Sequence, residues 1–253
     1  MSQRALGHQE PSRRGGVARP PAAAVGALFR GISALRSARS LHPQGLVFEA
    51  TLEVDRPDPE LSGAPLFARA GTHAAVVRLS RAAGLPQPLP DGHGFAIRIV
   101  DAHGEGGHQD FLLVTSLDGA LLHHLLLPSR GFFSLPYSSL LLYRISGAVR
   151  LVGALAVTEP VAGGSDFDEL LRSANRGAVR FALALSGLLG RWESIAEVRL
   201  GERLSPDDAA RVRFNPWNTG GGIHPAGPLM GLREAAYRES QRGWTANAEE
   251  PRG

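Results

Sequence analysis

The sequence predicts an α+β protein in which short strands form an antiparallel β-barrel and α-helices surround it. Two observations support this fold class. Four strand-like runs occupy the first half of the chain, at residues 46–54, 74–80, 94–101 and 111–115. Turns rich in Pro, Gly and Asp separate them, and short strands at such spacing favour an antiparallel sheet or barrel. After residue 117 the spacing of apolar residues becomes helical.

Helical patterns are predicted on both sides of the strand region. One follows Pro20-Pro21 and has Leu28, Ile32 and Leu35 on a single face. The predicted helices cover residues 21–38, 119–127, 138–157, 166–189 and 229–242. Further extended runs occupy residues 193–200 and 211–214. We expect the strands between 46 and 115 and those between 193 and 214 to close the barrel, with the helices between 117 and 189 packed outside it.

The chain is expected to form one domain between two tails. Residues 1–20 are predicted to be a flexible arm, residues 21–245 the folded domain and residues 246–253 a disordered tail. The arm has no continuous apolar run, so we expect a cytoplasmic location. Residues 138–157 are the most apolar window, but Arg144 and Arg150 interrupt it and argue against a membrane span.

The composition excludes several classes of chemistry. The chain has no cysteine, so any metal or cofactor must be held by His, Tyr, Met or carboxylate groups. All 27 basic residues are arginine, which excludes Schiff-base and P-loop chemistry because both need a lysine. The net charge of +3 is small and dispersed, so no nucleic-acid partner is expected.

A histidine before the first predicted strand is the first candidate for chemistry. Arg39 and His42 stand three residues apart and lead into the alternating segment that follows Gly45. A histidine just before a strand is placed near any ligand that the sheet encloses. The alternative is a turn histidine before Pro43.

A tyrosine in the last predicted helix is the second candidate. Arg233 and Tyr237 are four residues apart, which places them on one helical face. A guanidinium beside a tyrosine favours the phenolate, an anionic ligand suited to ferric iron and one way to hold haem without cysteine. Tyr137 and Tyr143 have no cation one turn before them. An ordinary surface pair of Arg233 and Tyr237 stays open as the alternative.

Several motifs resemble those of the catalase family and follow the same order. Residues 39–45 resemble its distal histidine motif, Arg-Val-Val-His-Ala-Lys-Gly, and Val77-Arg78-Leu79-Ser80 is similar to Val-Arg-Phe-Ser. Residues 91–98 resemble Asp-Pro-Arg-Gly-Phe-Ala-Val-Lys. Phe214-Asn215-Pro216 matches Phe-Asn-Pro, and Arg233 to Tyr237 matches Arg-x-x-x-Tyr. The resemblance covers roughly residues 25–245 and is to the small catalase-related haem proteins.

The resemblance implies a catalase-like antiparallel barrel with surrounding helices that binds haem b and its iron. It also implies a role for each matching residue: His42 as the distal acid and base, Ser80 as its hydrogen-bonding support, Tyr237 as the iron ligand, Arg233 as the partner of the phenolate, and Arg39 and Arg78 as partners of the haem propionates. Arginine is well suited to binding carboxylates, and a histidine can transfer the proton of a peroxide.

Two departures from the family pattern concern the distal pocket. The family's distal asparagine is absent after residues 109–114, so the positioning of peroxide is expected to depend on a hydroxyl, that of Thr115. The phenylalanine that stacks on the haem is replaced within Leu121-Leu122-His123. A wider pocket that admits organic hydroperoxides follows from the second change.

The sequence therefore predicts an oxidoreductase, a haem peroxidase or catalase-related enzyme that acts on hydrogen peroxide or organic hydroperoxides. Its reductant is not identified by the sequence. One alternative is a fatty-acid hydroperoxide-converting enzyme like the allene oxide synthases, in which threonine precedes the distal histidine where Leu41 stands here. Another is a non-enzymatic protein that binds haem or a lipid-like ligand. A weak membrane-surface contact and a homo-oligomer both stay open.

Overall fold

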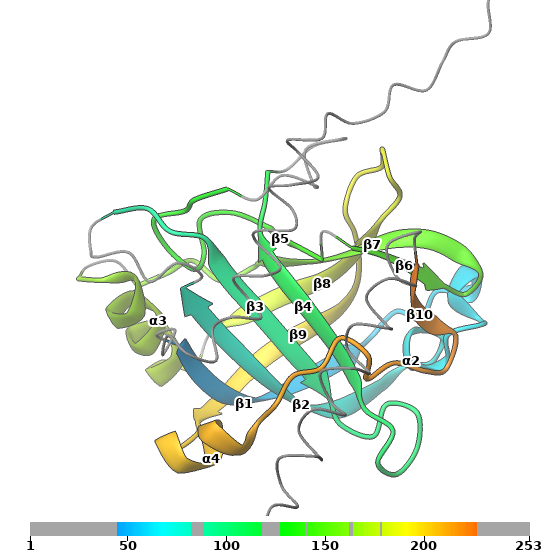
Figure 1. Cartoon of the computed structure of the whole chain (residues 1–253), viewed down its shortest axis with the longest axis horizontal. Helices are drawn as coiled ribbons and strands as arrows, with labels where there is room; N and C mark the ends of the chain where they lie inside the picture. The colour runs from blue at the N-terminus through cyan, green and yellow to red at the C-terminus, as the bar shows by residue number, and fades with distance from the viewer. Residues whose placement is uncertain are drawn as a thin grey trace, which may run out of the picture.

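The computed structural model describes residues 45–81, 89–117, 127–139, 141–161, 164–177 and 179–226. Within this part, eight antiparallel strands close into a barrel (Figure 1). They pair in the order β5-β4-β3-β2-β1-β9-β8, and β7 closes the ring by pairing with both β8 and β5. The strands are β1 (Gly45–Val54), β2 (Gly71–Arg81), β3 (His93–Ile99), β4 (Gln109–Thr115), β5 (Tyr137–Ser138), β7 (Ala148–Ala156), β8 (Arg180–Ser186) and β9 (Glu193–Arg203). The predicted α+β fold with an antiparallel barrel is confirmed.

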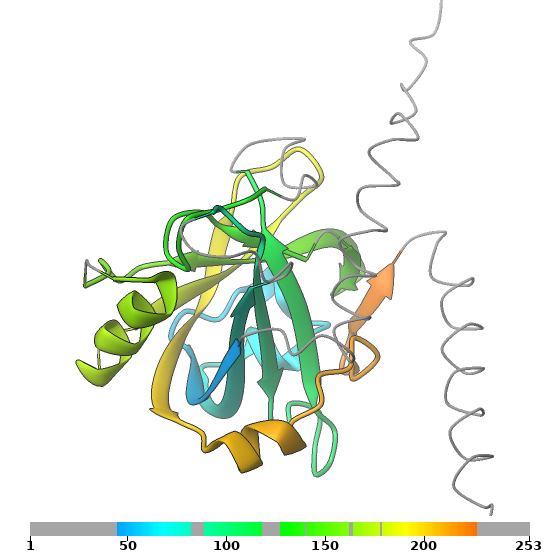
Figure 2. The same cartoon turned by 60° about the vertical axis from the view of Figure 1, so that its left-hand side comes forward.

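Short helices lie around the barrel. The longest described helix is α3 (Asp166–Asn175), which begins with a capping box between Ser165 and Asp168. The helix α4 (Pro206–Arg211) follows the end of β9 (Figure 2). The others are α2 (Pro65–Ala68) and the 3-10 helix η1 (Pro59–Leu61). None of the helices in the described ranges is long and apolar enough to cross a membrane.

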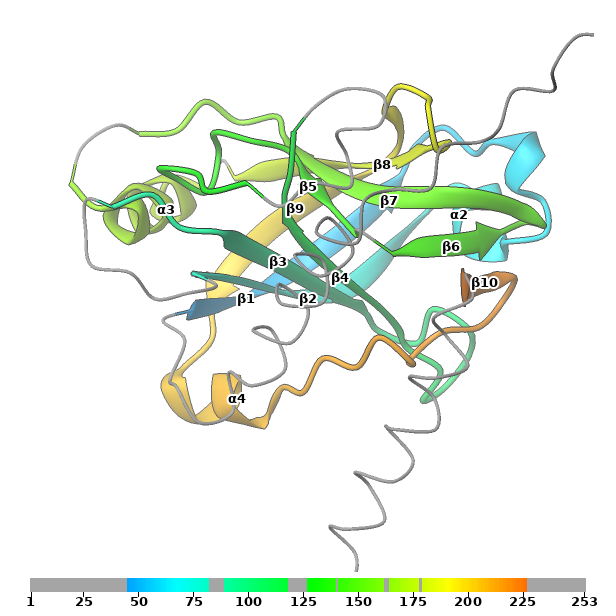
Figure 3. The ribbon, with the colours of Figure 1, turned by 45° about the horizontal axis from the view of Figure 1, so that its top comes forward.

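A small additional ladder extends the sheet away from α3. The strand β6 (Leu142–Ile145) pairs with β7, and β10 (Ile223–Ala226) pairs with β6. Both lie at the side of the barrel opposite α3 (Figure 3). Through β10, the segment that follows α4 is attached to the barrel at its far end.

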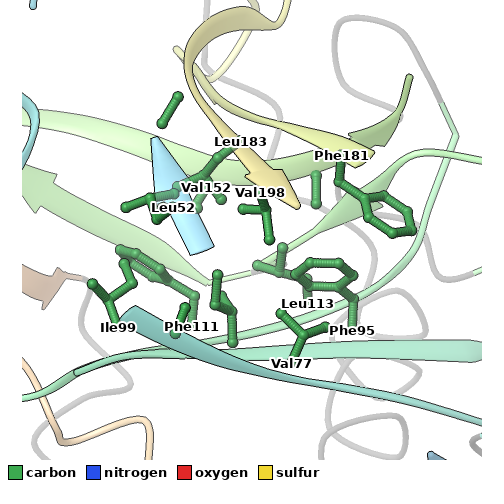
Figure 4. Packing of buried hydrophobic residues seen from close by; sticks show 14 of the residues in the cluster. Leu52, Val77, Phe95, Ile99, Phe111, Leu113, Val152, Phe181, Leu183 and Val198 are labelled. Atoms are coloured by element: carbon green, nitrogen blue, oxygen red, sulfur yellow. The ribbon is translucent and has the colours of Figure 1, made fainter. Parts of the chain in front are cut away.

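Strict alternation of side chains builds the barrel core. In β1 the side chains of Phe48, Leu52 and Val54 point inward and are buried, whereas Glu49 between them is exposed. The pairing of β1 with β2 places Phe48 opposite Val77, so both strands present their apolar face to the same interior. Side chains from all sides of the ring meet there (Figure 4).

The second half of the chain differs from the sequence prediction. Residues 138–157, predicted as one helix, form β5, β6 and β7. The β6–β7 turn has positive φ at Ser146 (50°) and Gly147 (84°), a conformation that reverses the chain tightly. Residues 166–189, also predicted as one helix, contain α3 only up to Asn175 and then β8.

Three smaller differences and gaps remain. Residues 212–214 form no strand, because Arg211 ends α4 and a connection without ladder pairing follows. The predicted helices at residues 21–38 and 229–242, and all of the one at 119–127 except Leu127, lie outside the described residues. Of the helices expected between 117 and 189, α3 is the one that the described part contains.

Candidate functional site

Two of the predicted site residues, Arg78 and Ser80, project from β2 on the outer face of the barrel. Their neighbours Val77 and Leu79 are fully buried in the core, and the period of a strand places alternate side chains on the opposite face. A Cβ added at Gly45, on the adjacent strand, would lie 2.9 Å from Arg78 Nε and 3.0 Å from Ser80 Cβ. The glycine therefore leaves the room that the arginine side chain occupies.

Small and apolar residues continue this face across β3 and β4. Ser80 pairs with Gly94, and Arg78 pairs with Ala96. Gly94 in turn pairs with Val114, and Ala96 with Leu112. Because Gly94 and Ala96 carry almost no side chain, the strip between Arg78 and the β4 residues is low and flat, a shape that suits a planar ring.

An ion pair at the end of this face fastens the segment that follows α4. Arg98 Nε and Nη2 donate to the two oxygens of Asp110 at 2.8 and 2.7 Å, which raises the pKa of Arg98. Asp110 also accepts hydrogen bonds from the main-chain N–H of Asn215 at 2.7 Å and from Asn218 Nδ2 at 3.1 Å. The guanidinium of Arg98 lies 5.8 Å from the ring centre of Phe214. The Phe214-Asn215-Pro216 motif is thus attached beside the face that carries Arg78.

The electrostatics of this face favour an anion. Burial lowers the pKa of Arg78, and the positive charge of Arg213 lowers it further. Arg213 immediately precedes the Phe-Asn-Pro motif, and its carbonyl oxygen accepts a hydrogen bond from Arg98 Nη2. Two guanidinium groups that repel each other gain stability from a carboxylate between or beside them.

The structure does not bring Thr115 to this face. Thr115 is fully buried and alternates in phase with Phe111 and Leu113, so it points into the barrel. Its hydroxyl donates to the carbonyl of Leu127 at 2.7 Å and accepts from the main-chain N–H of His93 at 3.1 Å. Both contacts lie on the inner face at one end of the barrel, whereas Arg78 and Ser80 project from the outer face.

A buried charged cluster occupies that same end of the barrel. The guanidinium of Arg81 lies 3.3 Å from Asp91 and 3.3 Å from Asp166, the first residue of α3. His93 Nε2 lies 2.9 Å from Asp166 Oδ2. Burial lowers the pKa of His93, and the hydrogen bond and charge of Asp166 offset this in part. The cluster holds α3 to the barrel, and no group of three or more metal-ligating side chains is found in the described ranges.

Sequence reasoning missed this cluster as well as Arg213. It named Asp91 and His93 only within a resemblance motif, in which His93 stands where the family has arginine. In the structure Arg81 pairs directly with His93 across β2 and β3, so the neighbouring strand supplies the buried arginine. The sequence does contain an indication of this cluster. In β2 every second residue points inward, and Arg81 follows the apolar residues Val77 and Leu79 at the next inward position.

Two of the three tyrosines of the chain lie in the described ranges. Tyr137 and Tyr143 lie in the barrel core, with 0% and 1% of their surface exposed. The hydroxyl of Tyr137 donates to the carbonyl of Phe132 at 2.7 Å, and burial raises its pKa well above 10. Tyr143 packs against Phe111, with 5.3 Å between ring centres. Neither core tyrosine is placed to bind iron as a phenolate.

The remaining predicted site residues lie outside the described ranges. They are Arg39, His42, Arg233 and Tyr237. Their roles as propionate partner, distal acid and base, phenolate partner and iron ligand therefore stay predictions.

Comparison with known proteins identifies the fold. No protein-family model matches the sequence, and no curated protein matches it. A fungal catalase structure is similar with a TM-score of 0.59 at 12% identity, over 94% of this chain and 66% of that catalase. A bacterial catalase is similar with a TM-score of 0.51 at 14% identity, over 85% of this chain and 60% of that catalase. The chain therefore has a catalase-like fold, as the motifs predicted, and it spans less than two thirds of the length of these catalases.

Proposed function

We propose that this protein is a haem-dependent oxidoreductase that acts on hydrogen peroxide or organic hydroperoxides. The observation that carries the proposal is the outer face of β2 and β3. There Arg78 and Ser80 border the flat strip of Gly94 and Ala96, on a fold that catalases share. Cations at the edge of a flat apolar surface are what a planar ring with two carboxylates requires.

The described residues fit one edge of haem b. Arg78 and Arg213 provide positive charge for carboxylates, and the small side chains of β3 would let a ring approach the main chain of the strands closely. The burial of Tyr137 and Tyr143 in the core leaves Tyr237 as the tyrosine available to ligate iron. Because the chain has no cysteine, a tyrosinate ligand is consistent with its composition.

When bound, haem would supply a ferric iron that reacts with the O–O bond of a peroxide. His42 would take the proton of the incoming peroxide and return it to the departing oxygen, as a general base and then a general acid. Ser80 would orient the imidazole of His42 by a hydrogen bond. Arg78 would hold a propionate and so fix the ring relative to both residues.

An absorption spectrum with iron analysis, after expression with a haem precursor, tests the proposal. We expect one haem per chain, with a Soret band and an iron content to match. Added hydrogen peroxide or cumene hydroperoxide should then be consumed together with a reducing dye. A protein that carries no haem under these conditions would refute the proposal.

A second candidate is a protein that binds haem without turnover. The position of Thr115 favours it, because the hydroxyl expected to position peroxide points into the barrel instead. The same peroxide experiment separates the two functions. Consumption of the reducing dye supports the enzyme, whereas bleaching of the Soret band without dye oxidation supports the binding protein.

A further inference from the structure

The arginine before the Phe-Asn-Pro motif has a fixed position next to β3. The carbonyl oxygen of Arg213 accepts a hydrogen bond from Arg98 Nη2, and two residues that follow Phe214, Asn215 and Asn218, both donate to Asp110. The Asp110 side chain is fully buried, so the hydrogen bonds from Asn215 and Asn218 end at a carboxylate that is shielded from water. The main chain of Arg213 is therefore held by the fold rather than by its own side chain.

The side chain of Arg213 has no carboxylate partner in the described part of the chain. Its Nη1 donates to the carbonyl oxygens of Ala210 and Val212, both of its own segment. Neighbouring arginines differ, because Arg98 is neutralised by Asp110 and Arg211 lies 3.4 Å from Asp208. Arg213 is also exposed, so its charge is available to a ligand.

The second cation of this region is Arg78. On the neighbouring strand β3, Arg78 pairs with Ala96, and Arg98 follows two residues later on the same face. Arg78 and Arg98 are therefore diagonal neighbours. Because Arg98 donates a hydrogen bond to the carbonyl oxygen of Arg213, Arg213 lies near the same part of the outer face as Arg78. Burial lowers the pKa of Arg78, and the smaller additional lowering by the charge of Arg213 agrees with this placement.

We propose that Arg78 and Arg213 together bind a ligand carboxylate at the edge of the Gly94–Ala96 strip. The resemblance to catalases assigns a propionate to Arg78, whereas the second cation, Arg213, comes from the connection after α4 and is placed by the structure. The carboxylate could belong to haem or to a fatty-acid hydroperoxide, and the inference rests on the proposed function for the identity of the site. Arginine forks bind carboxylates from either source in the same way.

The haem source is tested by equilibrium titration of the haem-free protein with haemin and with haemin dimethyl ester, which has no free carboxylate. We expect the native protein to bind haemin at least about tenfold more tightly than the diester, the size of a charge-assisted hydrogen bond. In Arg213→Gln that preference should be several-fold smaller than in the native protein, because Arg78 is then the one cation of the pair that remains. The matched control is Arg211→Gln, which removes an exposed arginine two residues away that already has Asp208 as partner.

The fatty-acid source is tested by fluorescence titration with cis-parinaric acid and its methyl ester, for the same variants. A smaller acid-over-ester preference for parinaric acid in Arg213→Gln, with the haemin preference unchanged, assigns the carboxylate to the fatty acid. A smaller preference in the haemin titration assigns it to a propionate. If Arg213→Gln matches Arg211→Gln in both titrations, or the native protein shows no preference in either, the inference is overturned. A native protein that binds neither form of haemin refutes the proposed function instead, and the fatty-acid titration still decides the carboxylate site.

Discussion

Arg98 and Asp110 stand directly opposite each other on β3 and β4, joined by two hydrogen bonds of 2.8 and 2.7 Å. The carboxylate is fully buried, and it also accepts hydrogen bonds from Asn215 and Asn218. One side chain thereby joins two barrel strands to the segment that carries Arg213. Asp110 is therefore the residue that fastens this segment to the barrel.

Replacing Asp110 by Asn should destabilise the protein strongly. The substitution keeps the shape but leaves the guanidinium of Arg98 without its counter-charge, and breaking a buried ion pair costs about 3 kcal/mol. Urea unfolding followed by circular dichroism measures the loss. The control is Glu197→Gln, which breaks the partly exposed ion pairs of Glu197 with Arg180 and Arg199 and should cost at most about 1 kcal/mol. Equal losses in the two variants would show that Asp110 does not have this role.

The buried His93 should make stability depend on pH. Burial lowers its pKa below 6.5 in the folded protein, so the unfolded chain binds the proton first on acidification. Stability is therefore retained above pH 6.5 and lost as the pH falls below it, by up to about 1.4 kcal/mol per pH unit until the folded histidine also protonates. Arg81, Asp91 and Asp166 surround the ring, and Asp166 limits the size of the shift.

Urea unfolding between about pH 7.5 and about pH 5 tests this dependence in the native protein and in His93→Gln. The slope of unfolding free energy against pH should be smaller in the variant. The control His224→Gln removes an exposed histidine of β10 and leaves His93 in place. An identical slope in the native protein and His93→Gln would mean that another group is responsible.

Gly222 should not tolerate a side chain. It has a φ of +78°, and an added Cβ would overlap the main-chain carbonyl oxygen of Gly63. The expected loss for Gly222→Ala is about 2–4 kcal/mol, the sum of backbone strain and overlap. Gly106→Ala is the matched control, because Gly106 has a φ of +72° but nothing within 4 Å of the added Cβ. A thermal unfolding midpoint equal for both variants would contradict the role assigned to the Gly63 contact.

The first strands are predictable because each has one face inside and one face outside. In β1, Phe48 and Leu52 alternate with Glu49 and Thr51, and the polar positions are exposed. Such alternation indicates a strand with little ambiguity. In β2 the same period is enough to predict that Arg78 and Ser80 share one face of the strand.

The later strands were missed because they are buried on both faces. Residues 151–154 of β7 are all buried, and the ring of Trp192 lies so close to Gly153 that an added Cβ would be 2.6 Å from it. Residues 183–186 of β8 are also continuously buried. An apolar run without alternation resembles a buried helix, and only the Ser146-Gly147 turn marks the reversal of the chain.

Site residues could be predicted only where their placement follows from the alternation of side chains within one strand. Thr115 was predicted from its distance to a motif, yet its phase with Phe111 and Leu113 indicates an inward side chain. Arg213 could not be found, because its position results from a hydrogen bond to Arg98 that joins residues 115 apart in the chain. The spacing of residues within one helix or strand cannot predict a contact between residues so far apart in the chain.

The last prediction concerns the iron ligand. Tyr137 and Tyr143 are enclosed in the barrel core, and burial holds the pKa of Tyr137 well above 10, so neither is suited to be a phenolate ligand. Tyr237, the third tyrosine, has Arg233 four residues before it, and a nearby guanidinium stabilises a phenolate. Tyr237→Phe should therefore abolish haem binding or change the charge-transfer band of the ferric protein.

Tyr137→Phe is the control for this experiment. It removes the hydrogen bond to Phe132 and should cost about 1 kcal/mol of stability, while haem content and spectrum stay the same. Haem content is measured by iron analysis, and the ligand by the absorption spectrum of the ferric protein. Because the eight described barrel strands all lie between Gly45 and Arg203, loss of haem in Tyr237→Phe should leave the circular dichroism spectrum of the barrel intact. Full haem loading with an unaltered charge-transfer band in Tyr237→Phe would remove Tyr237 as the ligand, and with it the main role that the catalase resemblance assigns to the last predicted helix.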